Sequence, residues 1–145
     1  MPFWRLFYHV VFATRGRHTL PTDGLRTEAR RLLWSKAEAL GCIVHAVAVQ
    51  PDHVHLALSI PPSKAIGQVV GQIKGSSSHG MSSLLPPTHT FSWQESYGVF
   101  SVGERNLPHV VRYLDDQDQR HATGKLWPML EQTESASSKE SRSEI

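Results

Sequence analysis

Two histidines separated by a single residue, His53 and His55, are the side chains in this sequence best suited to chemistry. Successive side chains of a β-strand point to opposite faces, so on a strand these two imidazoles share one face while Val54 points to the other. Their Cα atoms would lie roughly 6.6 Å apart, from a rise of about 3.3 Å per residue. That spacing allows both rings to bind one metal ion, although two polar residues on a solvated sheet face would show the same pattern.

A second pair of candidates, Tyr113 and Gln117, stands near the C-terminus. Residues four apart on a helix are neighbours on one face, with Cβ atoms about 5–6 Å apart. A phenol and an amide oxygen would therefore approach the same point in space. Taken alone, an aromatic residue on a helix face and a solvated glutamine explain the pair equally well, so its meaning depends on whether this helix covers the histidine strand.

Apolar periodicity and turn residues predict the elements that would position these side chains. The Pro51-Asp52 turn makes a hairpin of the second and third predicted strands, and the histidine pair begins its second strand. Thr22 and Ser63 are candidate helix N-caps, and Pro108 suits the first turn of the last long helix. Strands are predicted at residues 3–13, 42–49, 53–60 and 97–102, and helices at residues 22–40, 63–85, 106–121 and 127–130.

The first six elements follow the order strand-helix-strand-strand-helix-strand. This order predicts an α+β fold with a ferredoxin-like antiparallel sheet and helices on one face. The following C-terminal helix, which carries Tyr113, is an addition available for function. We predict a single domain over residues 1–130 and a disordered tail over residues 131–145, which are rich in Ser and Glu and poor in apolar residues.

Composition limits the class of protein. The chain has 145 residues, of which 39% are hydrophobic and 19% charged, as expected of a soluble globular protein. No apolar run approaches the ~20 residues needed to span a bilayer, and the N-terminus does not resemble a signal peptide. The single cysteine, Cys42, cannot form an internal disulfide. We therefore expect a reduced, cytoplasmic setting without membrane contact.

The net charge of +2 identifies no partner, but the charges are unevenly distributed. Residues 1–36 carry seven Arg and Lys side chains against two acids, whereas residues 115–145 carry seven acids against four bases. This asymmetry allows a phosphate-binding face near the N-terminus. A solvated helix face explains the basic residues between 26 and 36 equally well. Arg15 and Arg17 follow a predicted strand in a loop and are better candidates for DNA contact.

Five segments in a fixed order resemble a known family. The chain is similar to the small single-tyrosine HUH transposases of bacterial insertion sequences (TnpA type), including their repeat-associated relatives. The histidine pair with one apolar residue between is a weak signal alone, but the ordered set is specific. The segments are residues 8–15 (YHVVFATR), 49–56 (VQPDHVHL), 70–78 (VGQIKGSSS), 93–102 (WQESYGVFSV) and 111–117 (VRYLDDQ).

The resemblance implies a role for each candidate. His53, His55 and Gln117 would hold a divalent cation, Mg²⁺ or Mn²⁺, and Tyr113 would be the nucleophile. The family cuts single-stranded DNA next to a small hairpin, forms a 5′-phosphotyrosine bond, leaves a free 3′-OH and rejoins strands by the reverse step. It implies a bacterial homodimer that is nucleoid-associated when bound to DNA, in which Tyr113 acts on its own subunit or on the other. Lys74, in the I-K-G-S pattern, would contact DNA or be a solvated helix lysine.

Elementary chemistry is consistent with these roles. Phosphodiester displacement needs charge neutralisation and a nucleophile in line with the leaving oxygen, and a phenol, with a pKa near ~10, ionises far more readily than an alcohol. Two imidazoles favour zinc or another transition metal over magnesium, so Mg²⁺ or Mn²⁺ comes only from the resemblance. Two alternatives stay open: a domesticated relative that binds or nicks repeats without transposing, and a small metal-dependent phosphate hydrolase, which would need neither Tyr113 nor a basic face.

Overall fold

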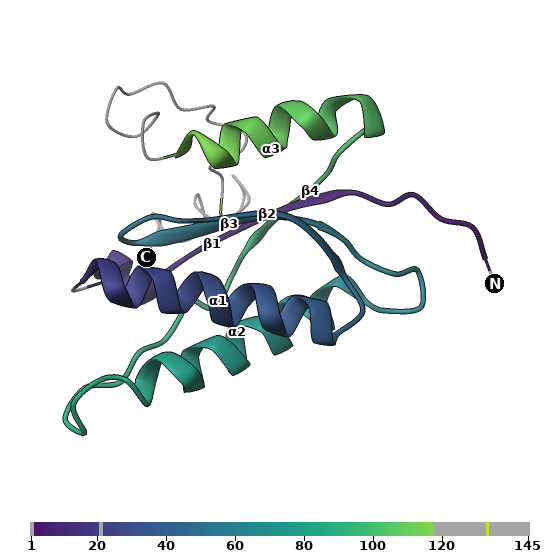
Figure 1. Ribbon diagram of the computed structural model, residues 1–145. Helices are drawn as coiled ribbons and strands as arrows, with labels where there is room; N and C mark the ends of the chain where they lie inside the picture. Colours follow the sequence, from purple (N-terminus) through teal and green to yellow (C-terminus); the bar gives the residue numbers. More distant parts are fainter. Residues whose placement is uncertain (1, 21, 118–132, 134–145) are drawn as a thin grey trace, which may run out of the picture.

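An antiparallel sheet separates two helices on one face from a single helix on the other (Figure 1). The computed structural model describes residues 2–20, 22–117 and 133. Helices α1 and α2 cover one face of the sheet and α3 lies over the opposite face (Figure 1). The described elements are β1 (Tyr8–Ala13), α1 (Asp23–Ala39), β2 (Ile43–Val49), β3 (His53–Ser59), α2 (Ile66–Ser82), β4 (Gly98–Ser101) and α3 (Leu107–Asp115), with short 3-10 turns η1 (Arg15–Arg17) and η2 (Glu104–Asn106).

The strands lie in the order β2-β3-β1-β4, and every neighbouring pair is antiparallel. This topology confirms the predicted α+β, ferredoxin-like sheet with an added C-terminal helix. The turn at Pro51 and Asp52 closes the β2–β3 hairpin, where the Gln50 amide donates to the His53 carbonyl at 2.8 Å. The start of β3 is thereby fixed, with His53 opposite Ala13 and His55 opposite Val11 of β1.

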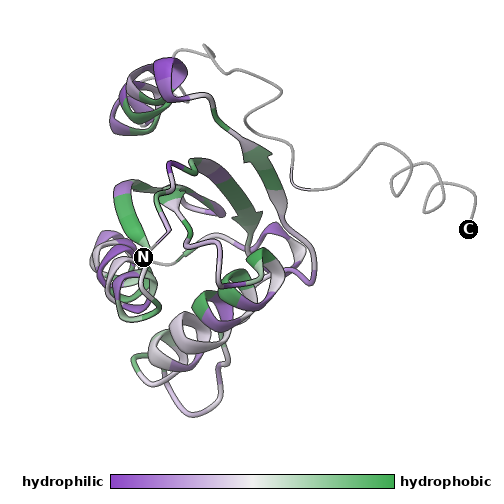
Figure 2. Ribbon diagram, turned by 90° about the vertical axis from the view of Figure 1, so that its right-hand side faces the viewer, coloured by the Kyte–Doolittle hydropathy of each residue, from purple (hydrophilic) through white to green (hydrophobic). Residues whose placement is uncertain are grey.

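The main core lies between the sheet and helices α1 and α2. Alternate residues of each strand face these helices, as the two-residue period of a strand requires. The strands of this layer are coloured as hydrophobic in Figure 2. The fully buried residues of this core come from the strands and from both helices, and they include Val10, Phe12, Leu33, Leu56, Leu58 and Ile73.

The opposite face of the sheet is lined with small side chains where α3 packs. A β-bulge between Val44 and Ala46 adds one residue to β2, so Val44 and Val47 both face the core while Ala46 and Ala48 face α3. Together with Ala57 of β3, these alanines let the helix lie close to the sheet. Helix α3 buries an apolar stripe on this seat, made of Val110, Tyr113 and Leu114.

Two helix predictions differ in outcome. Thr22 caps α1 as predicted, because its hydroxyl accepts a hydrogen bond from the Leu25 amide at 3.2 Å. The Ser63 prediction is wrong: α2 begins at Ile66, and Ala65 occupies the N-cap position without a side-chain hydrogen bond. Strand β1 also begins at Tyr8, later than predicted.

Helix α2 continues without interruption through its Gly/Ser-rich centre, within the predicted helix over residues 63–85. Ser77 is fully buried, and its hydroxyl donates to the Ile73 carbonyl at 2.7 Å and accepts from the indole Nε1 of Trp93 at 2.9 Å. These contacts and the burial of Ile73 stabilise a segment of low intrinsic helix propensity.

Helix α3 begins at Leu107 with Pro108 in its first turn, as predicted, but ends at Asp115. Asp116 forms a turn, and Gln117 follows it. The predicted continuation to His121, the short helix at residues 127–130, the domain boundary at residue 130 and the disordered tail fall outside the described residues. Within the part of the chain that the structure describes, no helix is long and apolar enough to cross a membrane.

Candidate active site

His53 and His55 open strand β3 on the face covered by α3. Their side chains share that face because residues two apart on a strand point the same way. Their ring centroids lie 5.1 Å apart and the ring planes are inclined by 76°. His55 is fully buried and His53 is only 6% exposed, so both imidazoles lie in a largely water-excluded environment.

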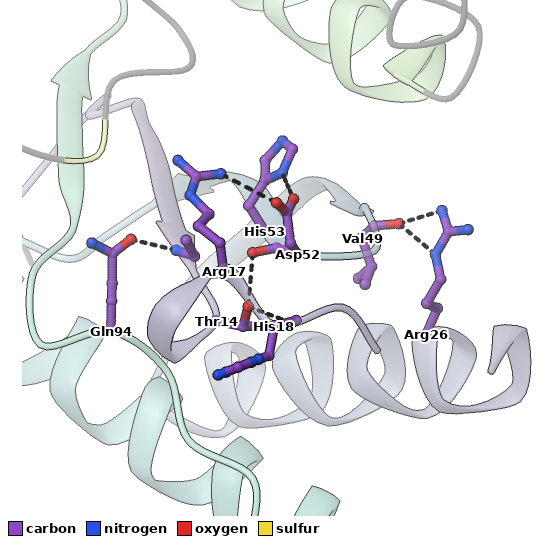
Figure 3. A network of polar contacts seen from close by, with 9 residues as sticks. Thr14, Arg17, His18, Arg26, Val49, Asp52, His53 and Gln94 are labelled. Atoms are coloured by element: carbon purple, nitrogen blue, oxygen red, sulfur yellow. Dashed lines mark hydrogen bonds and ion pairs between the residues drawn. The ribbon is translucent and has the colours of Figure 1, made fainter. Parts of the chain in front are cut away.

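The orientation of His53 is set by its neighbour in the hairpin turn. Asp52 Oδ1 lies 2.7 Å from His53 Nδ1, and Arg17 Nη1 lies 3.8 Å from Asp52 Oδ2, so the three side chains form a chain of charge and hydrogen bonding (Figure 3). Because Nδ1 is engaged with Asp52, Nε2 is the nitrogen that His53 would present to a metal.

The orientation of His55 is set by His9 of the adjacent strand. The Nε2 atom of His9 lies 2.9 Å from Nδ1 of His55, and the two rings stack with centroids 5.1 Å apart and planes 9° from parallel. His9 is fully buried and stacks on Phe100 of β4 at 5.8 Å. Sequence reasoning assigned no role to His9, because only the β1–β3 pairing register brings it beside His55.

Tyr113 of α3 is buried against this histidine cluster. Its ring is fully buried, with its centroid 6.2 Å from that of His55 and the planes 83° apart. Gln117, which has helical conformation directly after the Asp116 turn, is 1% exposed. The structure therefore brings Tyr113 beside the histidine pair of the same chain and buries Gln117 one turn away on the same side of the sheet.

A divalent cation fits the chemistry of this donor set. Two imidazole nitrogens and an amide oxygen suit a transition-metal ion better than Mg²⁺, which prefers oxygen ligands alone. Within residues 2–20, 22–117 and 133, no group of three or more His, Cys, Asp or Glu side chains is arranged to hold a metal. Among the described residues, Gln117 is the further side chain that could join His53 and His55 as a protein ligand, with other positions left for substrate oxygens.

Lys74, predicted as a DNA contact, lies on the other face of the sheet. Its ammonium donates to the carbonyl oxygens of the loop before β4, at 2.5 Å to Gln94, 3.2 Å to Glu95 and 3.1 Å to Ser96. It also lies 5.5 Å from the ring centroid of Phe12. Burial lowers the pKa of this ammonium. These contacts give Lys74 a structural role in holding the loop.

The other basic candidates fall into two groups. Arg15 and Arg17 are exposed in η1, next to the turn that carries Asp52. Arg26 and Arg30 of α1 instead donate to carbonyl oxygens of the edge strand β2: Arg26 to Val49 at 2.8 and 3.2 Å (Figure 3), and Arg30 to Val47 at 3.2 Å. These two arginines therefore satisfy backbone acceptors at the sheet edge, a role that the sequence did not predict.

The sequence and the fold both match known transposases. Residues 2–117 match the family described as IS200-like transposases. The ISDra2 transposase TnpA of Deinococcus radiodurans is 28% identical over 122 residues, which cover 81% of this chain and 87% of that relative. The transposase for insertion sequence element IS200 of Salmonella typhimurium is 29% identical over 128 residues, covering 84% of this chain and 83% of that relative.

Two solved structures share the architecture. A crystal structure from Deinococcus radiodurans R1, described as that of a transposase, has a TM-score of 0.65 at 30% identity and covers 80% of this chain and 93% of that one. The structure of the REP-associated tyrosine transposase bound to a REP hairpin has a TM-score of 0.63 at 16% identity and covers 83% of this chain and 74% of that one. At that identity the second structure shows the fold alone.

The match over residues 2–117 places the chain in the IS200-like transposase family. The proteins of this family are DNA-cleaving and strand-transferring enzymes that serve DNA transposition and are generally metal-dependent. The resemblance seen in the sequence is thereby confirmed at the level of the family.

Proposed function

We propose that this protein cuts and rejoins single-stranded DNA, with Tyr113 as the nucleophile and His53, His55 and Gln117 as ligands of a divalent metal. The observation that carries the proposal is the burial of the Tyr113 ring 6.2 Å from the His55 ring, on the face of the sheet that carries both histidines. This placement supports the proposal because it brings a phenol next to the imidazoles that would hold the metal.

The reaction is an in-line displacement at phosphorus. The Tyr113 hydroxyl loses its proton, its oxygen forms a bond to phosphorus, and the bond from phosphorus to the 3′-oxygen breaks, giving a 5′-phosphotyrosine and a free 3′-OH. A bound metal would neutralise charge on the non-bridging oxygens. Rejoining is the reverse attack by a 3′-OH, and the phosphotyrosine retains the bond energy that this step requires. Tyr113 has no exposed surface, so DNA binding must uncover it.

Asp52 and His9 act as positioning residues for the two histidines. If His55 binds metal through Nε2, its neutral ring carries its proton on Nδ1 and donates it to Nε2 of His9, 2.9 Å away. Asp52 accepts in the same way from Nδ1 of His53 at 2.7 Å. Such outer contacts fix the tautomer and ring orientation of a metal-binding histidine.

The DNA is a single strand with a hairpin. The solved relative with a REP hairpin shares the fold of this chain, and the exposed Arg15 and Arg17 lie beside the turn that orients His53. A homodimer is expected from the resemblance. Within one chain Tyr113 lies beside His55, which supports action of Tyr113 on its own subunit.

A denaturing gel tests the nucleophile. The protein is incubated with single-stranded hairpin oligonucleotides from its genomic flanks and with Mn²⁺ or Mg²⁺. A covalent protein–DNA band is expected, and Tyr113→Phe abolishes it while DNA binding persists. Tyr97→Phe is a matched control that also removes one phenol hydroxyl, but on the α1/α2 side of the sheet, and it keeps the band. A band that survives Tyr113→Phe overturns the assignment.

Two further measurements separate the alternatives. Loss of the adduct in His53→Ala, with hairpin binding retained, supports the metal ligands. Joining of the cut strand to a second oligonucleotide distinguishes strand transfer from nicking by a domesticated relative. If the wild-type protein binds no single-stranded hairpin but hydrolyses a small phosphate ester, the hydrolase alternative is correct instead.

A further inference from the structure

A cavity of about 480 Å³ lies on the far side of the η1 loop from the histidines, between this loop and the segment after α2. Among the described residues that line it, none is acidic. We propose that it holds one nucleotide of the single DNA strand, with the base against Phe91 and the adjoining phosphate at Arg15. This inference rests on the proposed function and adds a binding subsite to it. The lining residues that the proposal uses are Arg15, His18, Leu20, His89, Thr90 and Phe91.

The charge of the cavity suits a phosphodiester. Arg15 is exposed at its edge and makes no ion pair with any residue that the structure describes. By contrast, Arg31 on the outer face of α1 pairs with Glu28 at 2.8 Å. An unpaired guanidinium beside an acid-free cavity is available for a phosphate, to which it can donate two parallel hydrogen bonds.

The apolar part of the cavity suits a nucleobase. Phe91 is half-buried, and its ring packs edge-on against Trp93 with centroids 4.7 Å apart. Trp93 is in turn held by Phe12 at 4.9 Å, so the Phe91 ring is fixed from behind by core aromatics. A fixed aromatic face beside hydroxyl groups is a common way to bind an unpaired base, because stacking tolerates any base.

The walls of the cavity are fixed to one another and to the proposed metal site. The amide of Arg15 donates to the Ser92 carbonyl at 3.0 Å, which joins the two walls. On the other side of the loop, Thr14 Oγ1 lies 2.6 Å from the His18 carbonyl oxygen and 3.2 Å from that of Asp52 (Figure 3). Asp52 is the residue that orients His53. A nucleotide in the cavity would therefore lie one loop away from the reacting phosphodiester.

The backbone of the loop also has an uncommon shape. Gly16 and Arg17 both have positive φ, at 64° and 59°, and Arg17 is the only described residue other than glycine that does. A left-handed conformation at arginine is uncommon, and such outliers concentrate at functional sites. Here the conformation directs Arg17 toward Asp52 while Arg15 stays at the cavity. One side of the loop therefore faces the proposed metal site and the other faces the cavity.

Base removal along the DNA tests the subsite without any chemistry. Fluorescence anisotropy measures binding of a labelled hairpin oligonucleotide to the Tyr113→Phe protein in EDTA, and each unpaired nucleotide is replaced in turn by an abasic one. We expect one position at which loss of the base weakens binding about tenfold, the effect of one base stacked on an aromatic side chain. The background variant keeps DNA binding separate from cleavage.

Filling the cavity should abolish this position-specific loss. Thr90 is exposed and lines the cavity, so Thr90→Trp occupies the space without disturbing the core. In this variant the abasic substitution should not weaken DNA binding any further. Leu84→Trp is the matched control, since Leu84 is 51% exposed, lies on the same connection and does not line the cavity. It should keep the tenfold loss.

Arginine substitutions test the phosphate contact. Arg15→Gln should weaken binding at every sequence and lower the slope of log K against log salt by about 0.7, the value for one phosphate contact on a single strand. Arg31→Gln removes the same charge away from the cavity and should leave the slope unchanged.

The outcomes separate this subsite from the proposed function. An abasic profile that is flat, or that is the same in Thr90→Trp as in its parent, overturns the subsite even if Tyr113 forms its adduct with DNA. A profile that depends on Thr90, in a protein that never forms the adduct when Tyr113 is present, supports the subsite and rejects the nucleophile.

Discussion

The two faces of the sheet are built from the same strands but carry opposite kinds of side chain. Toward α1 and α2 the central strands present large apolar residues, all at most 1% exposed, such as Val10, Phe12, Leu56 and Leu58. Toward α3 the central strands present two buried histidines, His9 and His55, and the small residue Ala57, and the edge strand β2 adds Ala46 and Ala48. The two-residue period of a strand therefore separates stability from chemistry within a single layer.

The difference between the faces has an energetic meaning. Burying a leucine or phenylalanine side chain contributes about 1.5–3 kcal/mol, whereas an alanine methyl contributes far less. The α1/α2 face thus supplies most of the folding free energy. The α3 face buries less apolar area, because polar groups and small side chains occupy it and allow the close approach of Tyr113.

Substitution of two adjacent residues on β3 gives the largest expected contrast. Leu56→Ala should lower the free energy of unfolding by about 2–5 kcal/mol, because it leaves a cavity in the main core. His55→Ala should lower it less and yet abolish the DNA adduct. Urea unfolding and the adduct gel measure the two effects, with the gel run where both variants are folded. If His55→Ala destabilises the protein as much as Leu56→Ala, the proposed division between the faces is wrong.

Placing a larger side chain under α3 should have the next largest effect. Ala57 is fully buried beneath Tyr113 and its neighbours. Ala57→Leu should destabilise the protein by about 1–3 kcal/mol through overpacking, and it should displace α3 and reduce adduct formation. Ala57→Ser, which keeps the side chain small, is the control and should retain the adduct. Equal adduct yields in the two variants, measured on folded protein, would show that the small seat is not needed to place Tyr113.

The histidine strand and the alanines under α3 also show what the sequence could predict. Strand alternation placed His53 and His55 on one face, and turn residues placed them at the start of a hairpin strand, because both properties are local. The ferredoxin-like order followed from the sequence of elements. The seat could not be predicted, since it depends on the β-bulge that moves Ala46 and Ala48 to the α3 face.

The arrangements that sequence reasoning did not foresee depend on contacts between distant segments. His9 reaches His55 only through the pairing of β1 with β3. Lys74 matched a family pattern, but three loop carbonyls bind its ammonium on the other face. Ser63 looked like a helix cap, but α2 starts three residues later. Local spacing carries no information on which distant segment a side chain will meet.

Changing His9 tests whether the α3 face orients its histidines as proposed. His9→Leu should weaken Mn²⁺ binding about 10–100-fold, because Nδ1 of His55 loses the acceptor that fixes its ring. His9→Gln should keep most of the affinity, since its amide oxygen can reach the position of Nε2. His9→Asn is the matched control for the amide, because its shorter side chain cannot reach.

Titration calorimetry of the three variants measures this affinity directly, without DNA or cleavage. Ordering of the affinities as Gln above Asn and Leu supports positioning by a specific hydrogen bond. Equal affinities for Gln and Leu would mean that His9 only fills space, and the α3 face would then differ from the core face less than we propose.

The smallest expected effect concerns pH and His45, the histidine at the bulge of β2. Its Nε2 lies 2.8 Å from Ser59 Oγ, its ring packs against Phe7 with centroids 5.7 Å apart, and burial lowers its pKa below the usual value. Because the unfolded chain then binds a proton more readily than the folded one, stability rises with pH across this range. The contribution of His45 is fully present above the unfolded pKa of about 6.5 and is lost as pH falls through the folded pKa.

His45→Gln should therefore reduce the loss of stability between pH 7.5 and pH 5.5, an interval chosen to include roughly the unfolded pKa. Urea midpoints of this variant and of the wild type across that interval measure the effect, and the difference between them isolates the contribution of His45. His89→Gln removes an exposed loop imidazole and is the matched control. If His89→Gln changes the pH dependence as much as His45→Gln does, burial on the α3 face is not the cause. The midpoint of the wild type could also fall with pH no faster than that of His45→Gln. In that case protonation of His45 costs no folding free energy, and the α3 face is more open to water at β2 than at the His9–His55 pair.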